Sequence, residues 1–273
     1  MTVKARMKSL AKALVPAAAR ERELVIRETA STIKQIPGTR QTRRFEDSEV
    51  ERVRRELPAI PPARVVTIIA TYRRPEMVPR AVASALAQSV RDQVVIVVDD
   101  GGGLPDLPED PRLVAFSLSR NSGIAGVVRN VGMRVSRSEY VAFLDDDNEW
   151  DESHLEVALA ALEAGEDAGE AAGRPDAVYT AVERVFDDGR LMDVLSTGFD
   201  RRLLAGKSYI DTSSIVVRRT DDLHFSRIRR QRLHISEDWE LMFRMSRSAR
   251  VVHVPTPTVR YLINPQSYYS VWS

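Results

Sequence analysis

Three consecutive aspartates, Asp145, Asp146 and Asp147, directly follow the apolar segment 141–144. Apolar residues in a row are typical of a strand that is buried on both faces. Carboxylates at the end of such a strand repel one another and lose hydration unless a cation neutralises them. Cations of the Mg²⁺ type are usually bound by one or two carboxylates together with substrate phosphates. The triplet therefore predicts a metal site for a nucleotide diphosphate, or else a polar turn, which Asp also favours.

Strands and helices alternate after residue 64. Apolar and β-branched segments predict strands at 65–70, 94–98, 114–118, 140–144, 177–186, 214–218 and 251–254, with a hairpin turn at 187–189. Apolar residues at helical spacing predict helices at 76–89, 124–135 and 154–164, and one that begins near Ser236. The repeated strand–helix–strand order predicts an α/β fold whose sheet has a parallel core.

Polar residues follow three of these strands: Thr71-Tyr72-Arg73, Asp99-Asp100 and the aspartate triplet. Each segment alone is explained by turn-forming residues. The carboxyl ends of parallel strands, however, meet at one edge of the sheet, where ligands of such folds bind. We therefore expect the three segments to converge on one binding site.

The first part of the chain differs in composition and is rich in Arg, Lys, Glu and Ala. We expect helices at about 4–14 and 46–57, separated by a turn at Pro37-Gly38-Thr39, and a Pro-rich linker at 57–62. Charged helices of this kind are usually solvated arms. The alternative is that residues 1–57 contact an anionic membrane surface or another protein copy.

Domain boundaries follow from this change in composition. We expect a basic, helical extension with its linker at 1–62 and one domain at 63–273. Within that domain, we expect a nucleotide-binding half at 63–148 and an acceptor-binding and catalytic half at 149–273.

Composition excludes several classes of protein. A net charge of +1 gives no general attraction to nucleic acid, so we expect no such partner. The absence of cysteine excludes a disulfide framework, a thiolate nucleophile and a cysteine-based metal site. No apolar segment reaches the roughly 18 residues that cross a bilayer, and Pro16 interrupts the short apolar segment of a poor signal peptide. We expect a cytoplasmic protein, at the inner face of the membrane if residues 1–57 bind there.

Residues 64–248 resemble inverting family 2 glycosyltransferases with the GT-A fold. The resemblance is carried, in order, by segments 65–72, 94–101, 129–132 and 139–148 and by Glu237-Asp238. It implies a Rossmann-like GT-A fold with a mixed, mostly parallel sheet flanked by helices. It also implies a metal-dependent enzyme, using Mn²⁺ or Mg²⁺, that transfers sugar from a nucleotide-sugar donor, with UDP-sugar favoured. The acceptor would be a hydroxyl of a glycan, a lipid-linked molecule or a small molecule.

The same resemblance implies which residues bind the donor. They are Thr71, Tyr72, Arg73, Asp100, Arg129, Asp145 and Asp146. Asp100 would accept a hydrogen bond from a uracil-type imide, which suits an acceptor-only carboxylate. The guanidinium of Arg129 would approach the ribose or the diphosphate. Asp147 would be the main metal ligand, with Asp145 as the second candidate because three aspartates in a row leave the motif register open.

Asp238 matches the catalytic base of the family, with Glu237 as an alternate base or a supporting residue. A base in this position takes the proton of the attacking acceptor hydroxyl, while the metal stabilises charge on the departing diphosphate. One displacement inverts the anomeric centre. From the residues alone, acidic groups in the first turn of a helix are equally explained by the helix dipole. Segment 211–214 would lie under the two sugars. From the residues alone, the basic segment 227–232 is explained as a solvated charged loop, and the alternative is a mobile lid that holds the donor diphosphate or an anionic acceptor.

Two other functions compete with this interpretation. A nucleotidyltransferase also uses carboxylates and a metal, but normally has a Gly-rich, Lys-containing phosphate loop near the first strand, which Arg73-Arg74-Pro75 does not provide. A catalytically degenerate GT-A scaffold would act as a binding or assembly subunit through residues 1–57. The presence of both Asp147 and Asp238 argues against the scaffold.

Overall fold

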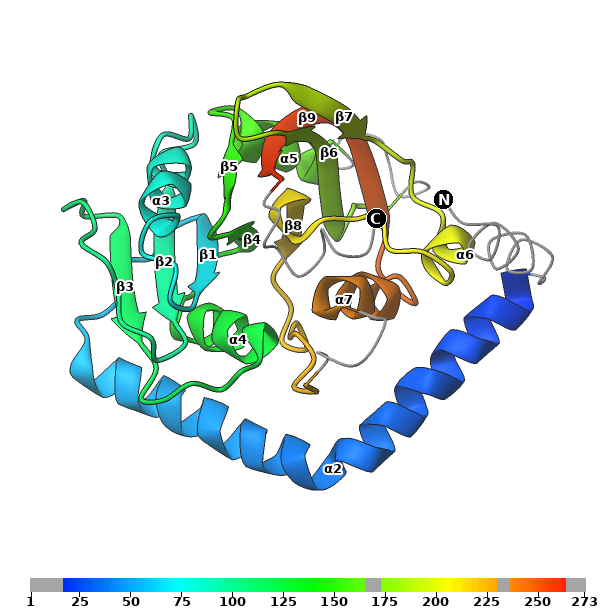
Figure 1. The fold of residues 1–273 in the computed structure, drawn as a ribbon, viewed down its shortest axis with the longest axis horizontal. Coiled ribbons are helices and arrows are strands. Elements are labelled where there is room, and N and C mark those ends of the chain that lie inside the picture. The colour runs from blue at the N-terminus through cyan, green and yellow to red at the C-terminus, as the bar shows by residue number, and fades with distance from the viewer. Residues whose placement is uncertain (1–16, 165–172, 230–235, 264–273) are drawn as a thin grey trace.

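A nine-stranded mixed sheet lies at the centre of the computed structural model, which describes residues 17–164, 173–229 and 236–263 (Figure 1). The strands are β1 (Val65–Thr71), β2 (Gln93–Asp99), β3 (Leu113–Ser117), β4 (Tyr140–Asp145), β5 (Asn148–Trp150), β6 (Ala177–Val185), β7 (Leu191–Leu195), β8 (Ile215–Arg218) and β9 (Val251–Leu262). Their order is β3-β2-β1-β4-β8-β6-β9-β5, and β7 pairs with β6. The first four are parallel, β8 is antiparallel to its two neighbours, and β6 and β9 are parallel again.

The register of the parallel strands brings their carboxyl ends together. Thr71 lies opposite Asp99 of β2, and Ala70 lies opposite Asp145 of β4. The polar residues that follow β1, β2 and β4 therefore start from the same edge of the sheet, as the sequence predicts.

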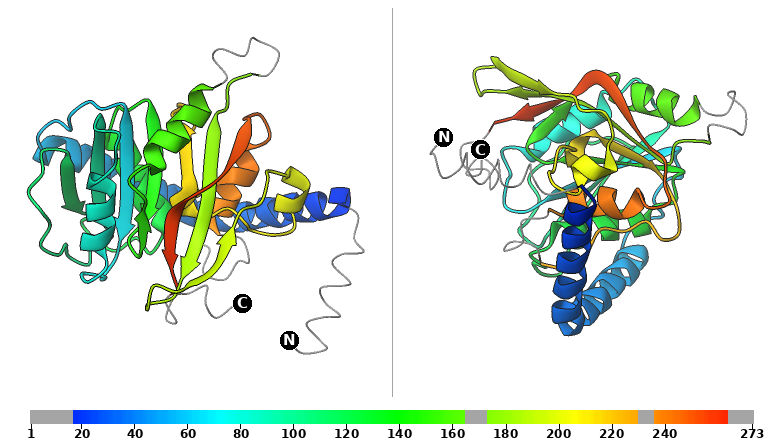
Figure 2. Two further views of the ribbon diagram at one scale, coloured as in Figure 1. Left: turned by 90° about the horizontal axis from the view of Figure 1, so that it is seen from above. Right: turned by 90° about the vertical axis from the view of Figure 1, so that its right-hand side faces the viewer.

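Helices cover both faces of the sheet (Figures 1 and 2). They are α2 (Ala17–Glu56), α3 (Val78–Leu86), α4 (Ala125–Val135), α5 (His154–Glu163), α6 (Arg201–Leu204) and α7 (Glu237–Met245), with a 3₁₀-helix η1 (Thr212–Ser214) before β8. Apolar residues of α3 and α5 pack on one face, and those of α4 and α7 pack on the other.

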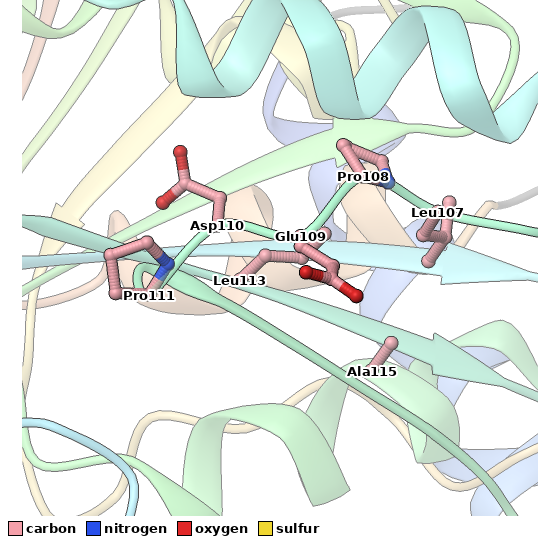
Figure 3. Close-up of a pocket in the computed structure, with 7 residues that line it drawn as sticks. All are labelled: Leu107, Pro108, Glu109, Asp110, Pro111, Leu113 and Ala115. Carbon is pink, nitrogen blue, oxygen red and sulfur yellow. The ribbon is translucent and has the colours of Figure 1, made fainter.

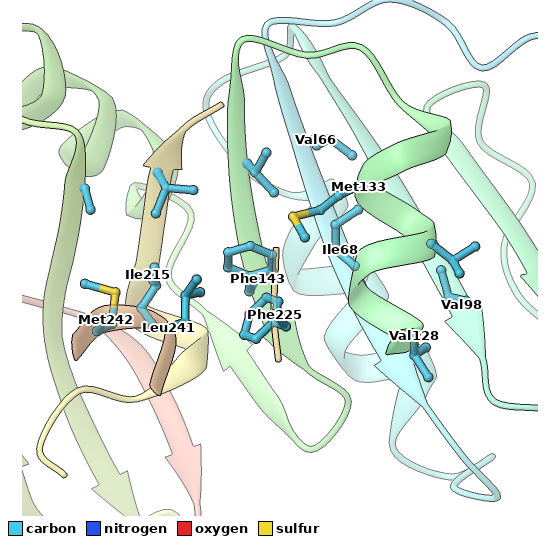
Figure 4. Packing of buried hydrophobic residues seen from close by; sticks show 14 of the residues in the cluster. Val66, Ile68, Val98, Val128, Met133, Phe143, Ile215, Phe225, Leu241 and Met242 are labelled. Atoms are coloured by element: carbon cyan, nitrogen blue, oxygen red, sulfur yellow. The ribbon is translucent and has the colours of Figure 1, made fainter. Parts of the chain in front are cut away.

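Side-chain alternation along the strands explains the two hydrophobic cores. In β1, Val65 and Ile69 face the side of α3, whereas Val66 and Ile68 face the side of α4. Figure 4 shows the second side, where Phe143 of β4 meets Phe225 from the segment before α7. Their rings are 4.9 Å apart and edge to face, a favourable aromatic geometry.

The turn predicted at Pro37-Gly38-Thr39 is wrong, because α2 continues through Pro37 as one 40-residue helix. Proline in a helix interior removes one hydrogen bond and bends the helix, and Figure 1 shows that α2 changes direction near its middle. Leu24 on one side of the bend and Val53 on the other are both buried. The helix predicted at 4–14 lies outside the described residues. Within the described residues, no helix combines the length and apolar character needed for a membrane crossing.

Strand β9 is longer than the predicted segment 251–254 and runs to Leu262. Pro255 and Pro257 lie within it, and the pairing with β6 shifts register on both sides of Ala181. Prolines in strands are tolerated at such irregularities, which explains why the sequence pattern stops at Val254 while the strand continues. The predicted turn before β7 is present, with Gly189 at a φ of 80°.

Candidate active site

Side chains at the end of β1 and in the loop after it bind the aspartate triplet. One guanidinium nitrogen of Arg74 lies 2.8 Å from a carboxylate oxygen of Asp146 and 2.8 Å from one of Asp147. The hydroxyl of Thr71 donates a hydrogen bond of 2.7 Å to the other oxygen of Asp146. Burial, together with the charges of Asp145 and Asp146, nevertheless raises the pKa of Asp147 to about 6. One cation is thus not enough to offset the desolvation of these carboxylates.

Arg129 connects the triplet to the first turn of α7. Its guanidinium lies 2.6 Å from a carboxylate oxygen of Asp145 and 3.1 Å from one of Glu237. Only 6% of Arg129 is exposed. Burial alone would lower its pKa, but the charges of Asp145 and Glu237 raise the pKa instead. The structure thus brings a predicted donor residue and the predicted catalytic helix into one ion-pair network.

Asp238 lies in the first turn of α7, as predicted for the catalytic base. One carboxylate oxygen accepts a hydrogen bond of 3.1 Å from the Thr212 hydroxyl, and the other accepts one of 2.7 Å from the backbone N–H of Trp239. Burial and then the neighbouring Glu237 raise the pKa of Asp238. A carboxylate with a raised pKa is a better general base at neutral pH.

Asp211 is a further carboxylate of this site that we did not predict individually. Burial, Asp145 and Asp238 all raise its pKa, so it lies close enough to both for their charges to act on it. One of its oxygens accepts a hydrogen bond of 2.9 Å from the N–H of Ser213. The Ser213 hydroxyl in turn contacts the backbone N–H of Asp145 at 3.2 Å. The sequence signals were the position of segment 211–214 before a strand and the resemblance, which implies that this segment lies under the two sugars.

Asp100, which is predicted to contact the nucleotide base, binds the loop that precedes α4. Its two oxygens accept hydrogen bonds from the N–H groups of Ser122 (2.8 Å) and Gly123 (2.9 Å), just before α4. Asp99 accepts similar bonds from Gly102 and Gly103. Carboxylate oxygens have more than one acceptor position, so the contact between Asp100 and a uracil stays a prediction.

Tyr72 and Arg73 lie at the open side of the site. Tyr72 is 38% exposed, and the guanidinium carbon of Arg73 is 5.1 Å from the centre of its ring. Arg73 has a φ of 55°, which is uncommon for a residue other than glycine and is found preferentially at functional sites. A Cβ atom on Gly102 would come within 2.9 Å of the Arg73 Cγ and 3.1 Å of the Tyr72 ring. Gly102 therefore leaves room for both side chains.

The basic segment 227–232, expected to be a solvated loop or a mobile lid, is described by the structure as far as Arg229. Arg227 makes two hydrogen bonds of 2.8 Å with Glu46 of α2. Arg229 donates a hydrogen bond of 2.8 Å to the carbonyl of Ser122. Both side chains are engaged in long-range contacts that the linear sequence does not reveal. Residues 230–232 lie outside the described residues.

The predicted metal ligands suit a site in which phosphate oxygens of the substrate supply the remaining ligands. In the described part of the chain, no group of three or more His, Asp or Glu side chains is placed to hold a metal ion. Asp145 and Asp147 supply partly exposed carboxylates, with exposed side-chain fractions of 28% and 16%. Burial, and then the charges of Asp145 and Asp146, raise the pKa of Asp147. One or two carboxylates with phosphate oxygens are the usual Mg²⁺ set, so these residues fit the ion.

An open pocket of about 580 Å³ lies elsewhere, beside the edge strand β3 (Figure 3). Its lining includes Leu107, Glu109 and Asp110 and none of the predicted site residues. Asp110 is already bound by Arg112 at 2.8 Å. The candidate active site is therefore the cluster of strand ends and α7.

Comparison with known proteins agrees with this geometry. The model of the family described as glycosyl transferase family 2 matches residues 66–242. The poly(ribitol-phosphate) beta-N-acetylglucosaminyltransferase TarP of Staphylococcus aureus (strain N315) is 37% identical over 101 residues, which cover 34% of this chain and 31% of that protein. The succinoglycan biosynthesis protein ExoO of Rhizobium meliloti (strain 1021) is 38% identical over 97 residues, covering 33% and 28%. The chain thus spans about a third of the length of these relatives.

Solved structures share the fold. S. aureus TarS 1–349 in complex with UDP-GlcNAc has a TM-score of 0.56 at 18% identity, covering 77% of this chain and 61% of that one. The mannosyltransferase PcManGT from Pyrobaculum calidifontis, in complex with GDP-Man and Mn²⁺, has a TM-score of 0.50 at 14% identity, covering 94% and 71%. The predicted fold, a GT-A-like mixed sheet with flanking helices and an N-terminal helical part, is confirmed.

Proposed function

Because the chain belongs to glycosyl transferase family 2, we propose that it transfers a sugar, with inversion, from a nucleotide-diphosphate donor to an acceptor hydroxyl. The observation that carries this proposal is the network of Asp145, Arg129 and Glu237. It joins the strand ends, where ligands of α/β sheets bind, to the turn that holds Asp238. Donor binding and proton removal thereby come from one connected site.

The donor half of the site is 63–148 and the acceptor half is 149–273, following an extension at 1–62. Tyr72 offers an exposed ring beside the strand ends, against which a base can stack. Asp147 and Asp145 would hold a divalent cation together with the diphosphate. When bound, the cation would stabilise negative charge on the departing diphosphate.

Asp238 takes the acceptor proton in this proposal. As the acceptor oxygen forms its bond to the anomeric carbon, its hydrogen passes to a carboxylate oxygen of Asp238, and the bond to the diphosphate breaks. The Thr212 hydroxyl and the Trp239 N–H orient that carboxylate. Burial of Asp238 supports the role because it raises the pKa toward the working pH. One displacement inverts the anomeric centre and leaves no covalent intermediate.

The substrate classes are proposed from relatives. Their names concern cell-envelope polysaccharides, namely poly(ribitol-phosphate), colanic acid and succinoglycan. TarS was solved with UDP and with UDP-GlcNAc, and PcManGT with GDP-Man and Mn²⁺. We propose a UDP-sugar as donor and a cell-envelope glycan or its lipid-linked precursor as acceptor, with a GDP-sugar as the alternative donor.

Calorimetric titration tests the donor site directly. UDP, GDP and dTDP are each titrated into the wild type and Asp147→Ala, with Mn²⁺ and with EDTA. Metal-dependent binding of one nucleotide, lost in the variant, supports the proposal. If none of the nucleotides binds under any condition, the proposal fails and a non-catalytic scaffold becomes the better explanation.

A further inference from the structure

We propose that residues 45–53 of α2, here called the support segment, position the donor site through two buried carboxylates, Glu46 and Glu49. The inference rests on the proposed function. The support segment precedes the residues that the family model matches, 66–242. It is nevertheless packed into the catalytic domain, because Glu46 is 0% exposed, Glu49 is 3% exposed, and Val50 and Val53 are buried beside them. A solvated arm would not bury two carboxylates.

Glu46 has four hydrogen-bond contacts with three residues of the catalytic domain. Arg227 donates two bonds of 2.8 Å, Arg134 donates one of 2.9 Å, and the side-chain amide of Asn130 donates one of 3.1 Å. A buried carboxylate is tolerated when its oxygens are satisfied in this way. Removing the charge of Glu46 would leave two guanidinium groups with a weaker partner.

The contacts continue from Glu46 to Arg129. Asn130 follows Arg129 in α4, and its side chain makes two hydrogen bonds to the backbone of Phe225, at 2.7 and 3.0 Å. The guanidinium carbon of Arg129 lies 5.1 Å from the centre of the Phe225 ring. Through Asn130, Glu46 thereby fixes the position of Phe225, whose ring packs against Arg129. Since Arg129 pairs with Asp145 and Glu237, this branch leads to the catalytic turn.

Glu49 fixes a different loop, the one between β3 and α4. Its two oxygens accept hydrogen bonds from the N–H of Ser119 (2.9 Å) and from the Ser119 hydroxyl (2.5 Å). Arg52 pairs with Glu49 at 2.6 Å and also donates to the carbonyl of Ser117 at 2.7 Å. Although burial opposes it, hydrogen bonds from Arg52 and Ser119 keep the pKa of Glu49 below its usual value.

That loop continues to Ser122 and Gly123, whose N–H groups bind Asp100. The loop is therefore held from one side by the support segment and from the other by the nucleotide-binding strand end. Glu49 acts on the part of the site predicted to bind the base, and Glu46 acts on the part that contains Arg129. The two residues should consequently affect different kinetic constants.

The test compares Glu46→Gln, Glu49→Gln and a matched control, Glu51→Gln, in the full chain. Glu51 is exposed on the same helix, so its variant makes the same change of charge without the contacts. We expect Glu49→Gln to raise the Kd for UDP with Mn²⁺, and the donor KM, about tenfold with kcat nearly unchanged. We expect Glu46→Gln to lower kcat about tenfold with a smaller change in Kd, and Glu51→Gln to match the wild type.

Equal changes of kcat and Kd in both variants, or no change in either, would overturn the inference. Ser119→Ala covers the case in which Glu49→Gln does not fold, because it removes one bond to Glu49 and keeps the charge pair with Arg52. It should still raise the Kd for UDP, by a smaller factor, and an unchanged Kd in this variant counts against the inference.

Hydrogen exchange separates this inference from the proposed function. If the wild type binds no nucleotide, the proposed function fails, but amide exchange still reports on the support segment. Glu49→Gln should accelerate exchange in a peptide that contains Ser122 and Gly123 more than in peptides of the central strands, whereas Glu51→Gln should not. Exchange at the wild-type rate in Glu49→Gln would overturn the support role whatever the activity.

Discussion

The guanidinium of Arg74 lies 2.8 Å from the carboxylate of Asp147 and so places a fixed positive charge beside the predicted metal ligand. The same nitrogen also contacts Asp146. In the absence of a metal ion, this side chain offsets part of the repulsion within the aspartate triplet. A cation bound with the diphosphate would compete with Arg74 for Asp147.

Arg74→Gln should therefore make the protein more dependent on metal. Without the guanidinium, Asp146 and Asp147 lose their partner, so we expect a lower Tm in EDTA, by about 2–4 °C for each kcal/mol lost. Mn²⁺ should then raise the Tm of the variant more than that of the wild type, because binding no longer displaces Arg74. Arg80→Gln, which removes a more exposed arginine paired with Glu149, is the control. Equal responses to Mn²⁺ in wild type and Arg74→Gln would contradict this account.

Asp238→Asn should remove the base and leave the donor site intact. General-base catalysis contributes about 10²–10⁴ in rate, so we expect kcat to fall by that factor with little change in the Kd for UDP. The measurement combines initial rates of sugar transfer with calorimetry. Glu237→Gln should have a smaller effect on kcat, since its carboxylate is engaged with Arg129. A larger loss from Glu237→Gln than from Asp238→Asn would reverse the two roles.

Stability should fall in acid because of His154. This residue is 0% exposed, its Nδ1 lies 2.8 Å from the Thr258 hydroxyl, and its ring stacks on Trp150. Burial lowers its pKa from 6.5 to about 3. Between these two values the unfolded chain binds a proton that the folded protein does not. The free energy of unfolding therefore decreases as the pH falls through this window, by about 1.4 kcal/mol per pH unit from this group.

Urea unfolding at pH 7, 6, 5 and 4 measures that dependence. His154→Gln is expected to be less stable at pH 7 but to lose less further stability on acidification. The comparison is therefore between the changes of the unfolding free energy with pH, and not between its values at one pH. His253→Gln serves as the control, because His253 is only partly buried. If His154→Gln keeps the wild-type slope, His154 is not the group responsible.

Gly38→Ala tests the continuous helix α2. No atom lies within 4 Å of a Cβ built on Gly38, so alanine fits without a clash. In a helix interior, alanine is more stable than glycine by about 0.8–1 kcal/mol. We expect higher helicity by circular dichroism and a higher midpoint of unfolding. A loss of helicity would favour the turn that the sequence suggested at this position.

Much of the fold was predictable because it depends on local pattern and on one topological rule. Apolar segments identified the parallel strands, and parallel strands such as β1 and β4 have their carboxyl ends at one edge of the sheet. The convergence of Thr71, Asp99 and Asp145 on one edge therefore required no knowledge of long-range contacts. Asp238 was identified by resemblance to the family, and its role stays a prediction.

The contacts that organise the site were not predictable in the same way. Arg74 and Arg129 each bind two acidic residues that are distant in the sequence. The resemblance identified Arg129 but not its ion-pair partners, and nothing local distinguishes Arg74 from other arginines. The turn at Pro37 was predicted from local residue preference. The helix continues through Pro37 instead because it is packed against the rest of the protein on both sides of the proline, at Leu24 and at Val53.

Helix α2 contacts two helices that are distant in the sequence. Near its start, Glu21 pairs with Arg201 of α6 at 3.1 Å. Beyond Pro37, Glu46 pairs with Arg134 of α4. Any movement of α6 relative to α4 must therefore stretch, bend or detach this helix. The missing backbone hydrogen bond at Pro37 makes bending there the least costly of the three, so α2 would accommodate such a movement at the proline.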